Sequence, residues 1–378
     1  MTKMSGQAAI ENRWRMLFAA AWQTILQSDS LMRLPPKVKI EFSRRIDASE
    51  CARIEWSRNI RLVISSKFAS DLDQELTRLA PTLSGLAFAS PEARKTRRLE
   101  VVAAVGDIAV TFVLLHELFH LMGGHLNWMS KPSGIAQFDE QRLGLAFGQY
   151  PSPGSRERAS RSSLSTSYVL ESEADSNAIQ WLIQFTELDP LCRLLRAKNL
   201  AVMDWAPQKR QPAFRLVLAA VWLIIRKLES SRSTWPELQG KTHPLPVTRL
   251  FIAFGTLLQE YSVISDIEYD EAGGGQHRPS GGDVPSIREF LWLVMGPVLK
   301  ADWSPGGETV PPNSLEGQMV FYFPDFANHM LNREVTTAVG RQIIHMERAR
   351  FRMDRTLKPY RFFPAAQLRR RSSKASSP

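Results

Sequence analysis

The stretch "LLHELFHLMGGH", residues 114–125, places three histidines and one glutamate close together in a chain that has seven histidines. His116 and His120 are four residues apart, so on a helix both imidazoles point to the same side, with Glu117 beside them. Imidazole nitrogen is a good ligand for zinc, an ion that needs no redox chemistry. The spacing therefore predicts a Zn²⁺ site with Glu117 as a general base.

A catalytic zinc needs a third protein ligand and one open position. Glu171, in "ESEADSNA", is the predicted ligand, and Asp175 lies four residues later on the same helix face. Asp175 is expected to accept the free N–H of a zinc-binding histidine. Glu173 points away from this face and is an alternative ligand. His125 is another alternative, and it could instead cap the helix end or contact the site without binding metal.

A third feature is "THPLPVTRL", residues 242–250. His243 precedes a proline that would start a helix, and Arg249 falls within that helix. Taken alone, a histidine in this position is an ordinary cap or surface residue. Its interest comes from its order after the two earlier motifs.

The segments "HELFH", "ESEAD" and "HPLPVTR" resemble the HExxH, ExxAD and HPxxxxR motifs of CAAX-prenyl-protease-type peptidases, and the first two resemble the gluzincin pattern of zinc metallopeptidases. A shorter match, "GGHLNW", is similar to Lit-like phage-exclusion peptidases. The resemblance covers roughly residues 110–260, and the transmembrane helices of the first family are missing. It implies hydrolysis of a peptide bond in an intracellular protein.

The predicted zinc ligands are His116, His120 and Glu171. Zinc would lower the pKa of its bound water to about 7. Glu117 would accept the proton of that water and pass it to the leaving amine. His243 or Arg249 could stabilise the tetrahedral oxyanion. The resemblance favours His243 for that role and Arg249 for holding the loop.

The expected fold class is α+β and predominantly helical, with a zincin-like metallopeptidase core, a small N-terminal antiparallel sheet and a C-terminal helical region. The predicted segments are an N-terminal helix and sheet at 1–90, the core at 91–264 with a flexible loop at about 130–167, a linker at 265–283, a helical region at 284–366 and a disordered basic tail at 367–378.

Periodicity places the individual elements within these segments. Strands are expected at 37–43, 51–57 and 60–66. Helices are expected at 8–27, 70–80, 99–122, 167–185, 189–198, 212–229, 245–262 and 285–300. Ser70 or Asp71 is the expected N-cap of the second helix, and a loop should follow it.

Composition limits the location and the partners. The two cysteines, Cys51 and Cys192, are too few for a disulfide framework, which fits a reducing compartment. The apolar runs 101–115 and 216–225 fall short of the roughly 20 residues that span a bilayer, and no signal peptide is evident. We expect a cytoplasmic protein with a protein or peptide substrate and no membrane span; the oligomeric state stays open.

Two other functions remain possible from the sequence. The net charge of +10 is concentrated partly in residues 348–374, so a nucleic-acid-associated regulator is conceivable but not favoured, since no nucleic-acid-binding motif is present. The second is an interaction protein with a structural zinc site. Glu117 argues against it, because a structural site does not need a base beside the metal.

Overall fold

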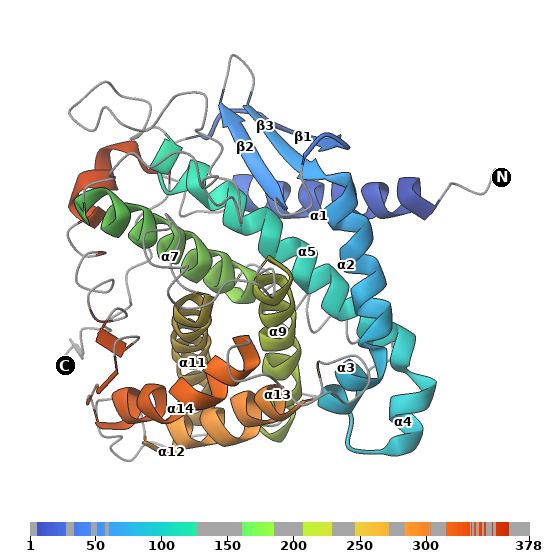
Figure 1. The fold of residues 1–378 in the computed structure, drawn as a ribbon, viewed down its shortest axis with the longest axis vertical. Helices are drawn as coiled ribbons and strands as arrows, with labels where there is room; N and C mark the ends of the chain where they lie inside the picture. The colour runs from blue at the N-terminus through green and yellow to red at the C-terminus, as the bar shows by residue number, and fades with distance from the viewer. Residues whose placement is uncertain are drawn as a thin grey trace.

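The computed structural model describes residues 6–27, 34–46, 51–56, 60–126, 161–184, 207–228, 246–271, 284–301, 303, 315–332, 334, 336–337, 340–341, 344, 350 and 353–362. Within these residues the protein is mostly helical with one small sheet (Figure 1), as the expected fold class states. The division into five segments and the zincin-like core stay predictions.

The sheet has three strands, β1 (Val38–Ser43), β2 (Ala52–Trp56) and β3 (Ile60–Ser65). Its order is β1-β3-β2; β2 runs antiparallel to β3, but β1 runs parallel to it. The prediction of an antiparallel sheet is therefore wrong for β1. Alternation along a strand shows which side chains face the core, but it does not determine which strands pair. A short connection makes β2 and β3 antiparallel neighbours, and β1 takes the other edge of β3.

Helix α5 (Arg98–Met122) carries the histidine motif and runs through the middle of the protein. From Val110 to Met122 all but one of its residues are buried, so no side of this part of the helix is left for solvent. A helix that is apolar on every side belongs in a core. It packs against α1 (Gly6–Leu26), β2 and other helices that surround it.

By length and composition α5 is also the one helix among the described residues that could cross a membrane, but 67% of its apolar window is buried inside the protein. A core helix passes the same test. The predicted absence of a membrane span and the predicted cytoplasmic location are untested.

The helices after the sheet differ from the predicted pattern. Helix α2 (Ser66–Arg78) begins four residues earlier than expected, because Oγ of Ser65 caps it by accepting the N–H of Phe68 at 3.2 Å. The predicted caps at Ser70 and Asp71 are wrong. The expected loop instead contains α3 (Ala80–Ala87) and α4 (Pro91–Thr96), each with proline in its first turn.

Three long helices follow: α7 (Arg161–Gln184), α9 (Pro207–Leu228) and α11 (Pro246–Glu271). Helices α7 and α9 pack against α5, and α11 packs against α7 and α9. Helix α7 lies beside α5 in Figure 1, and the buried small residues Ala174 and Ala178 allow a close approach.

Two helices extend beyond their predicted ends in this part of the chain. Helix α7 begins at Arg161, inside the loop expected to reach residue 167. Helix α11 continues to Glu271, past the expected start of the linker at residue 265. The predicted helix at 189–198 lies outside the described residues, as does most of that loop.

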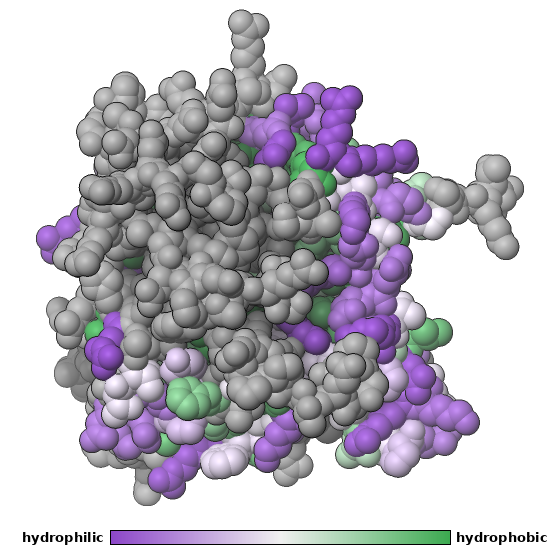
Figure 2. Space-filling view, in the orientation of Figure 1, coloured by the Kyte–Doolittle hydropathy of each residue, from purple (hydrophilic) through white to green (hydrophobic). Residues whose placement is uncertain are grey.

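The C-terminal part begins with α12 (Val284–Glu289), a π-helix η3 (Phe290–Met295) and α13 (Gly296–Lys300), where one helix was predicted. Helix α14 (Leu315–Asn332) and a 3₁₀ turn, η4 (Lys358–Tyr360), follow. Figure 2 shows hydrophilic side chains over the described surface near the sheet and α2. The predicted basic tail lies outside the described residues.

Candidate metal centre

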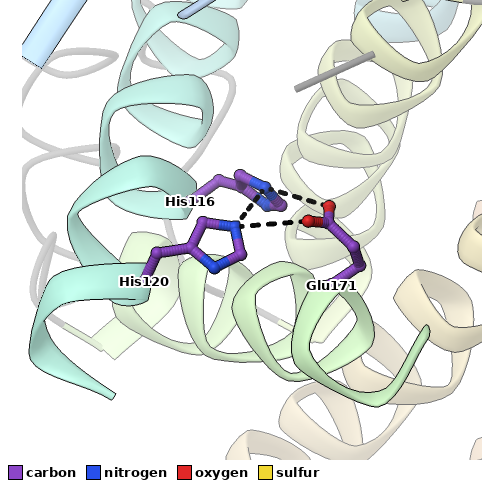
Figure 3. A group of neighbouring side chains, drawn as sticks. All are labelled: His116, His120 and Glu171. Carbon is purple, nitrogen blue, oxygen red and sulfur yellow. Dashed lines mark hydrogen bonds and ion pairs between the residues drawn. The ribbon is translucent and has the colours of Figure 1, made fainter. Parts of the chain in front are cut away.

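The site forms where α5 and α7 pack side by side. His116 and His120 project from successive turns of α5 toward Glu171 of α7 (Figure 3). All three side chains are buried, with at most 1% of the surface of each exposed. Among the residues that the structure describes, they form the group of histidine and acidic side chains whose ligand atoms lie close enough to hold one metal ion.

The distances between the three ligand atoms fit a tetrahedral ion. Nε2 of His116 lies 3.2 Å from Nε2 of His120; Oε2 of Glu171 lies 3.5 Å from the first nitrogen, and Oε1 of Glu171 lies 3.6 Å from the second. One ligand atom from each of the three residues lies within 4.8 Å of the other two. Zinc bonds of about 2.0–2.2 Å in tetrahedral geometry separate neighbouring ligand atoms by roughly 3.3–3.6 Å. Two imidazoles and one carboxylate are also a donor set that zinc prefers. The residues therefore fit Zn²⁺ in both chemistry and spacing.

Asp175 contacts His116 on the side away from the cluster. Its Oδ1 lies 2.9 Å from Nδ1 of His116, and a carboxylate at this position favours a hydrogen on Nδ1, which leaves Nε2 as the atom that would bind a metal. Arg249, near the start of α11, binds both oxygens of Asp175 at 2.7 Å. Burial would raise the pKa of Asp175, but Arg249 and His116 together lower it. Asp175 is therefore a carboxylate that can only accept hydrogen bonds.

The two histidines differ in their affinity for protons. Burial disfavours a charged His116, but hydrogen bonds with Asp175 and Glu171 outweigh burial and raise its pKa. For His120, burial lowers the pKa well below the ordinary value, and the neighbouring His116 and His125 add to this effect. A neutral imidazole is the form that binds metal, so His120 is already in that protonation state.

Glu117 lies between the two histidines in the sequence and is completely buried on α5. Its position on the helix, about 100° around from His116, places the carboxylate beside the histidine face rather than within it. Glu117 does not belong to the cluster of metal-binding atoms. A carboxylate in this position would accept a proton beside the metal and would not bind the metal itself.

A second set of buried polar residues lies behind His120. Nδ1 of His120 lies 2.9 Å from Nδ1 of His125, and Nε2 of His125 lies 3.4 Å from Oε2 of Glu173. The other oxygen of Glu173 forms an ion pair with Arg361 at 2.5 Å. Burial would raise the pKa of Glu173, but the hydrogen bond from His125 and the nearby positive charges lower it to about 2.

The sequence did not reveal this second set. Glu173 was considered only as an alternative ligand and His125 as a ligand, a helix cap or a contact; of these, the structure places His125 in contact with His120. Arg361 carries no local pattern that could have linked it to the motif.

Of the remaining predicted residues, His243 lies outside the described residues. Arg249 is brought to the site, where it holds Asp175. Its guanidinium is buried and bound to a carboxylate, an arrangement that suits orienting a neighbour better than stabilising an oxyanion. The expected role of Arg249 in holding a loop stays a prediction.

Comparisons with models of protein families, with curated proteins and with solved structures found no match to this chain. The geometry of the site is therefore the ground on which a function can be proposed.

Proposed function

We propose that the protein is a zinc metallopeptidase that hydrolyses a peptide bond of a protein or peptide substrate. The observation that carries this proposal is the buried triangle of His116, His120 and Glu171, whose ligand atoms are spaced for one tetrahedral ion. Glu117, which supplies no atom to this triangle, is the second support. A site that served only to stabilise the fold would not need this additional buried carboxylate.

When bound, zinc supplies Lewis acidity, which polarises a carbonyl and makes water acidic enough to lose a proton near neutral pH. His116, His120 and Glu171 are the residues that would hold the ion. Glu117 accepts a proton on its carboxylate and returns it to the leaving amine, so it acts as base and then as acid. Asp175 keeps His116 oriented throughout.

The test separates metal binding from hydrolysis. The Glu117→Gln variant keeps the shape of the side chain and all three ligands but removes the proton acceptor. We expect it to bind one zinc per chain and to lose hydrolysis, by at least the 10²–10⁴-fold that general-base catalysis contributes. His120→Ala should lose both properties, because it removes a ligand. Zinc is measured by atomic emission, and hydrolysis with a broad peptide library.

An exposed glutamate provides the control. Glu92→Gln makes the same chemical change at an exposed position in the first turn of α4, outside the histidine motif. It should alter neither zinc content nor cleavage. Purified protein without stoichiometric zinc, or Glu117→Gln with undiminished cleavage, would contradict the proposal. Zinc binding without any cleavage by the unaltered chain would favour a structural site.

A further inference from the structure

The two candidate zinc histidines are supported in parallel ways by buried groups. Behind His116 lie a carboxylate, Asp175, and then Arg249. Behind His120 lie an imidazole, His125, then a carboxylate and finally an arginine. In both sets the first supporting group contacts Nδ1 of the histidine, the ring nitrogen that points away from the metal-binding triangle.

The chemistry of Glu173 determines where the hydrogens sit in the second set. Glu173 is ion-paired with Arg361, so it is a carboxylate and only accepts. The hydrogen of His125 therefore belongs on Nε2, the atom that faces Glu173 at 3.4 Å. The other ring nitrogen of His125, Nδ1, faces Nδ1 of His120 at 2.9 Å and then accepts its hydrogen bond, so Nδ1 of His120 is the donor.

We propose that His125, Glu173 and Arg361 are positioning residues that hold His120 with its hydrogen on Nδ1, so that its Nε2 is free to bind the metal. This inference rests on the proposed metal centre and deepens it. The arrangement gives His120 what Asp175 gives His116, a fixed tautomer and a fixed ring orientation.

The spacing on α7 explains why an imidazole stands between His120 and its carboxylate. Glu173 and Asp175 are two residues apart, so their side chains leave the helix about 200° apart. Asp175 reaches its histidine directly, whereas Glu173 points away from the triangle. His125 lies just beyond the glycine turn that ends α5, and both of its ring nitrogens face protein groups. It thus connects the second carboxylate to His120 without joining the ligands.

The backbone around Arg361 holds this residue against the end of α5. The N–H of Phe362 donates to the carbonyl oxygen of Met122 at 2.9 Å. Gly124 has φ +79°, and a Cβ built there would lie 2.6 Å from the carbonyl carbon of Tyr360. The close approach at Gly124 lets the segment with η4 pack onto the turn, and it carries the Arg361 side chain into the interior, where 2% of it is exposed.

The first test reads the tautomer directly in metal-free protein. Long-range ¹H–¹⁵N correlation spectra of histidine-labelled protein distinguish a ring with its hydrogen on Nδ1 from one with it on Nε2. We expect His120 to carry it on Nδ1 in the unaltered chain. In Glu173→Gln the amide can donate as well as accept, so the tautomer of His125 is no longer fixed and His120 becomes a mixture.

The second test measures zinc affinity by competition with a chelator. Glu173→Gln should bind zinc about 10–100-fold more weakly, which is the loss typical of groups that orient a metal ligand. Asp107→Asn is the matched control. Asp107 lies on α5, as the two histidines do, and the substitution removes its partly buried ion pair with Arg13 of α1. It should leave both the tautomer and the affinity unchanged.

A pair of variants at Arg361 keeps the inference testable if Glu173→Gln does not fold. Arg361→Lys retains a positive charge beside Glu173 and should preserve most of the affinity, whereas Arg361→Met should lose it to the same extent as Glu173→Gln. Rescue by lysine is not expected from a residue that serves only to fill space.

The outcomes separate this inference from the proposed function. A hydrogen on Nε2 of His120 in the unaltered chain, or an unchanged tautomer and affinity in Glu173→Gln, overturns the positioning role while zinc binding and hydrolysis stand. If the chain binds zinc but cleaves nothing, the peptidase proposal fails and the positioning role is still decided by the spectra of the metal-free protein.

Discussion

Nδ1 of His116 lies 2.9 Å from Oδ1 of Asp175, and neither side chain has any surface exposed to solvent. This contact fixes the ring orientation of a candidate zinc ligand. Asp175→Asn should therefore weaken zinc binding by roughly 10–100-fold, measured by competition with a chelator. Asp71→Asn removes only a more exposed ion pair with Lys67 and should not change the affinity. An affinity equal to that of the unaltered chain would show that Asp175 does not orient the ligand.

Asp175→Asn should also destabilise the protein, because it removes the negative charge from the buried ion pair of Asp175 with Arg249. Breaking one side of a buried ion pair costs about 3–5 kcal/mol. The free energy of unfolding is measured in urea on metal-free protein, so that lost zinc binding does not contribute. A change below about 1 kcal/mol would mean that solvent reaches Arg249 in solution.

The identity of the third ligand can be tested with two alanine variants. Glu171→Ala removes a carboxylate whose Oε2 lies 3.5 Å from Nε2 of His116 and whose Oε1 lies 3.6 Å from Nε2 of His120, so the purified variant should contain little zinc. His125→Ala removes only a group behind His120 and should retain more metal, with an affinity loss of about 10–100-fold. Metal content is measured by mass spectrometry. The reverse order would assign the ligand to His125.

Gly124 should be the most sensitive glycine near the site. Alanine at this position would have to adopt φ +79° and would place Cβ 2.6 Å from the backbone of Tyr360. We expect Gly124→Ala to lower the free energy of unfolding by at least about 1–3 kcal/mol and to weaken zinc binding, since Arg361 follows Tyr360 directly. Thermal melting and chelator competition measure the two effects.

Gly85→Ala is the matched control for this substitution. Gly85 lies inside α3, where a Cβ would meet nothing within 4 Å, so alanine should be neutral or stabilising by about 0.5–1 kcal/mol. Equal effects of the two substitutions would contradict the close approach at Gly124.

A pH dependence of stability is expected from Asp325 in α14. Burial would raise its pKa, but hydrogen bonds from Thr337 and Thr336 outweigh burial and lower it. A lowered pKa in the folded state stabilises the protein above the pKa of the unfolded chain, about 3.9, and this stabilisation is lost as the pH falls through the folded value.

Asp325→Asn should therefore be destabilising near pH 7, by about 1.5–3 kcal/mol for hydrogen bonds to a charged group. The difference from the unaltered chain should shrink as the pH falls below about 4, because the carboxyl of Asp325 is protonated first in the unfolded chain and, at lower pH, in the folded protein. Urea unfolding at several pH values measures it. A difference that stays constant from pH 7 down to pH 3 would exclude a role for the charge.

The part of the site that the sequence predicts best depends on helix periodicity. Residues four apart share a face, so the motif itself places His116 beside His120 and Glu171 beside Asp175. The small residues Ala174 and Ala178 then indicate that α7 can approach another helix closely. The observed distances agree with these predictions, while the identity of the metal and the reaction stay proposals.

Contacts between distant segments could not be predicted in the same way. Arg361 reaches Glu173 because the chain from η4 returns to the end of α5, and no local spacing encodes that return. The parallel pairing of β1 with β3 is likewise a choice among strand edges that the alternation of side chains leaves open. The cap at Ser65 was missed because the strand runs directly into the helix without a turn.

The position of Arg361 has a consequence for biosynthesis. A ribosome releases His116, Glu171 and Arg249 well before it releases this arginine, so a nascent chain can gather the triangle and the support of His116 first. The support of His120 is added only when the segment after α14 has emerged and packed. On the proposed function, a nascent chain that ends before residue 361 would hold the three ligands but bind zinc about 10–100-fold more weakly than the chain that includes Arg361.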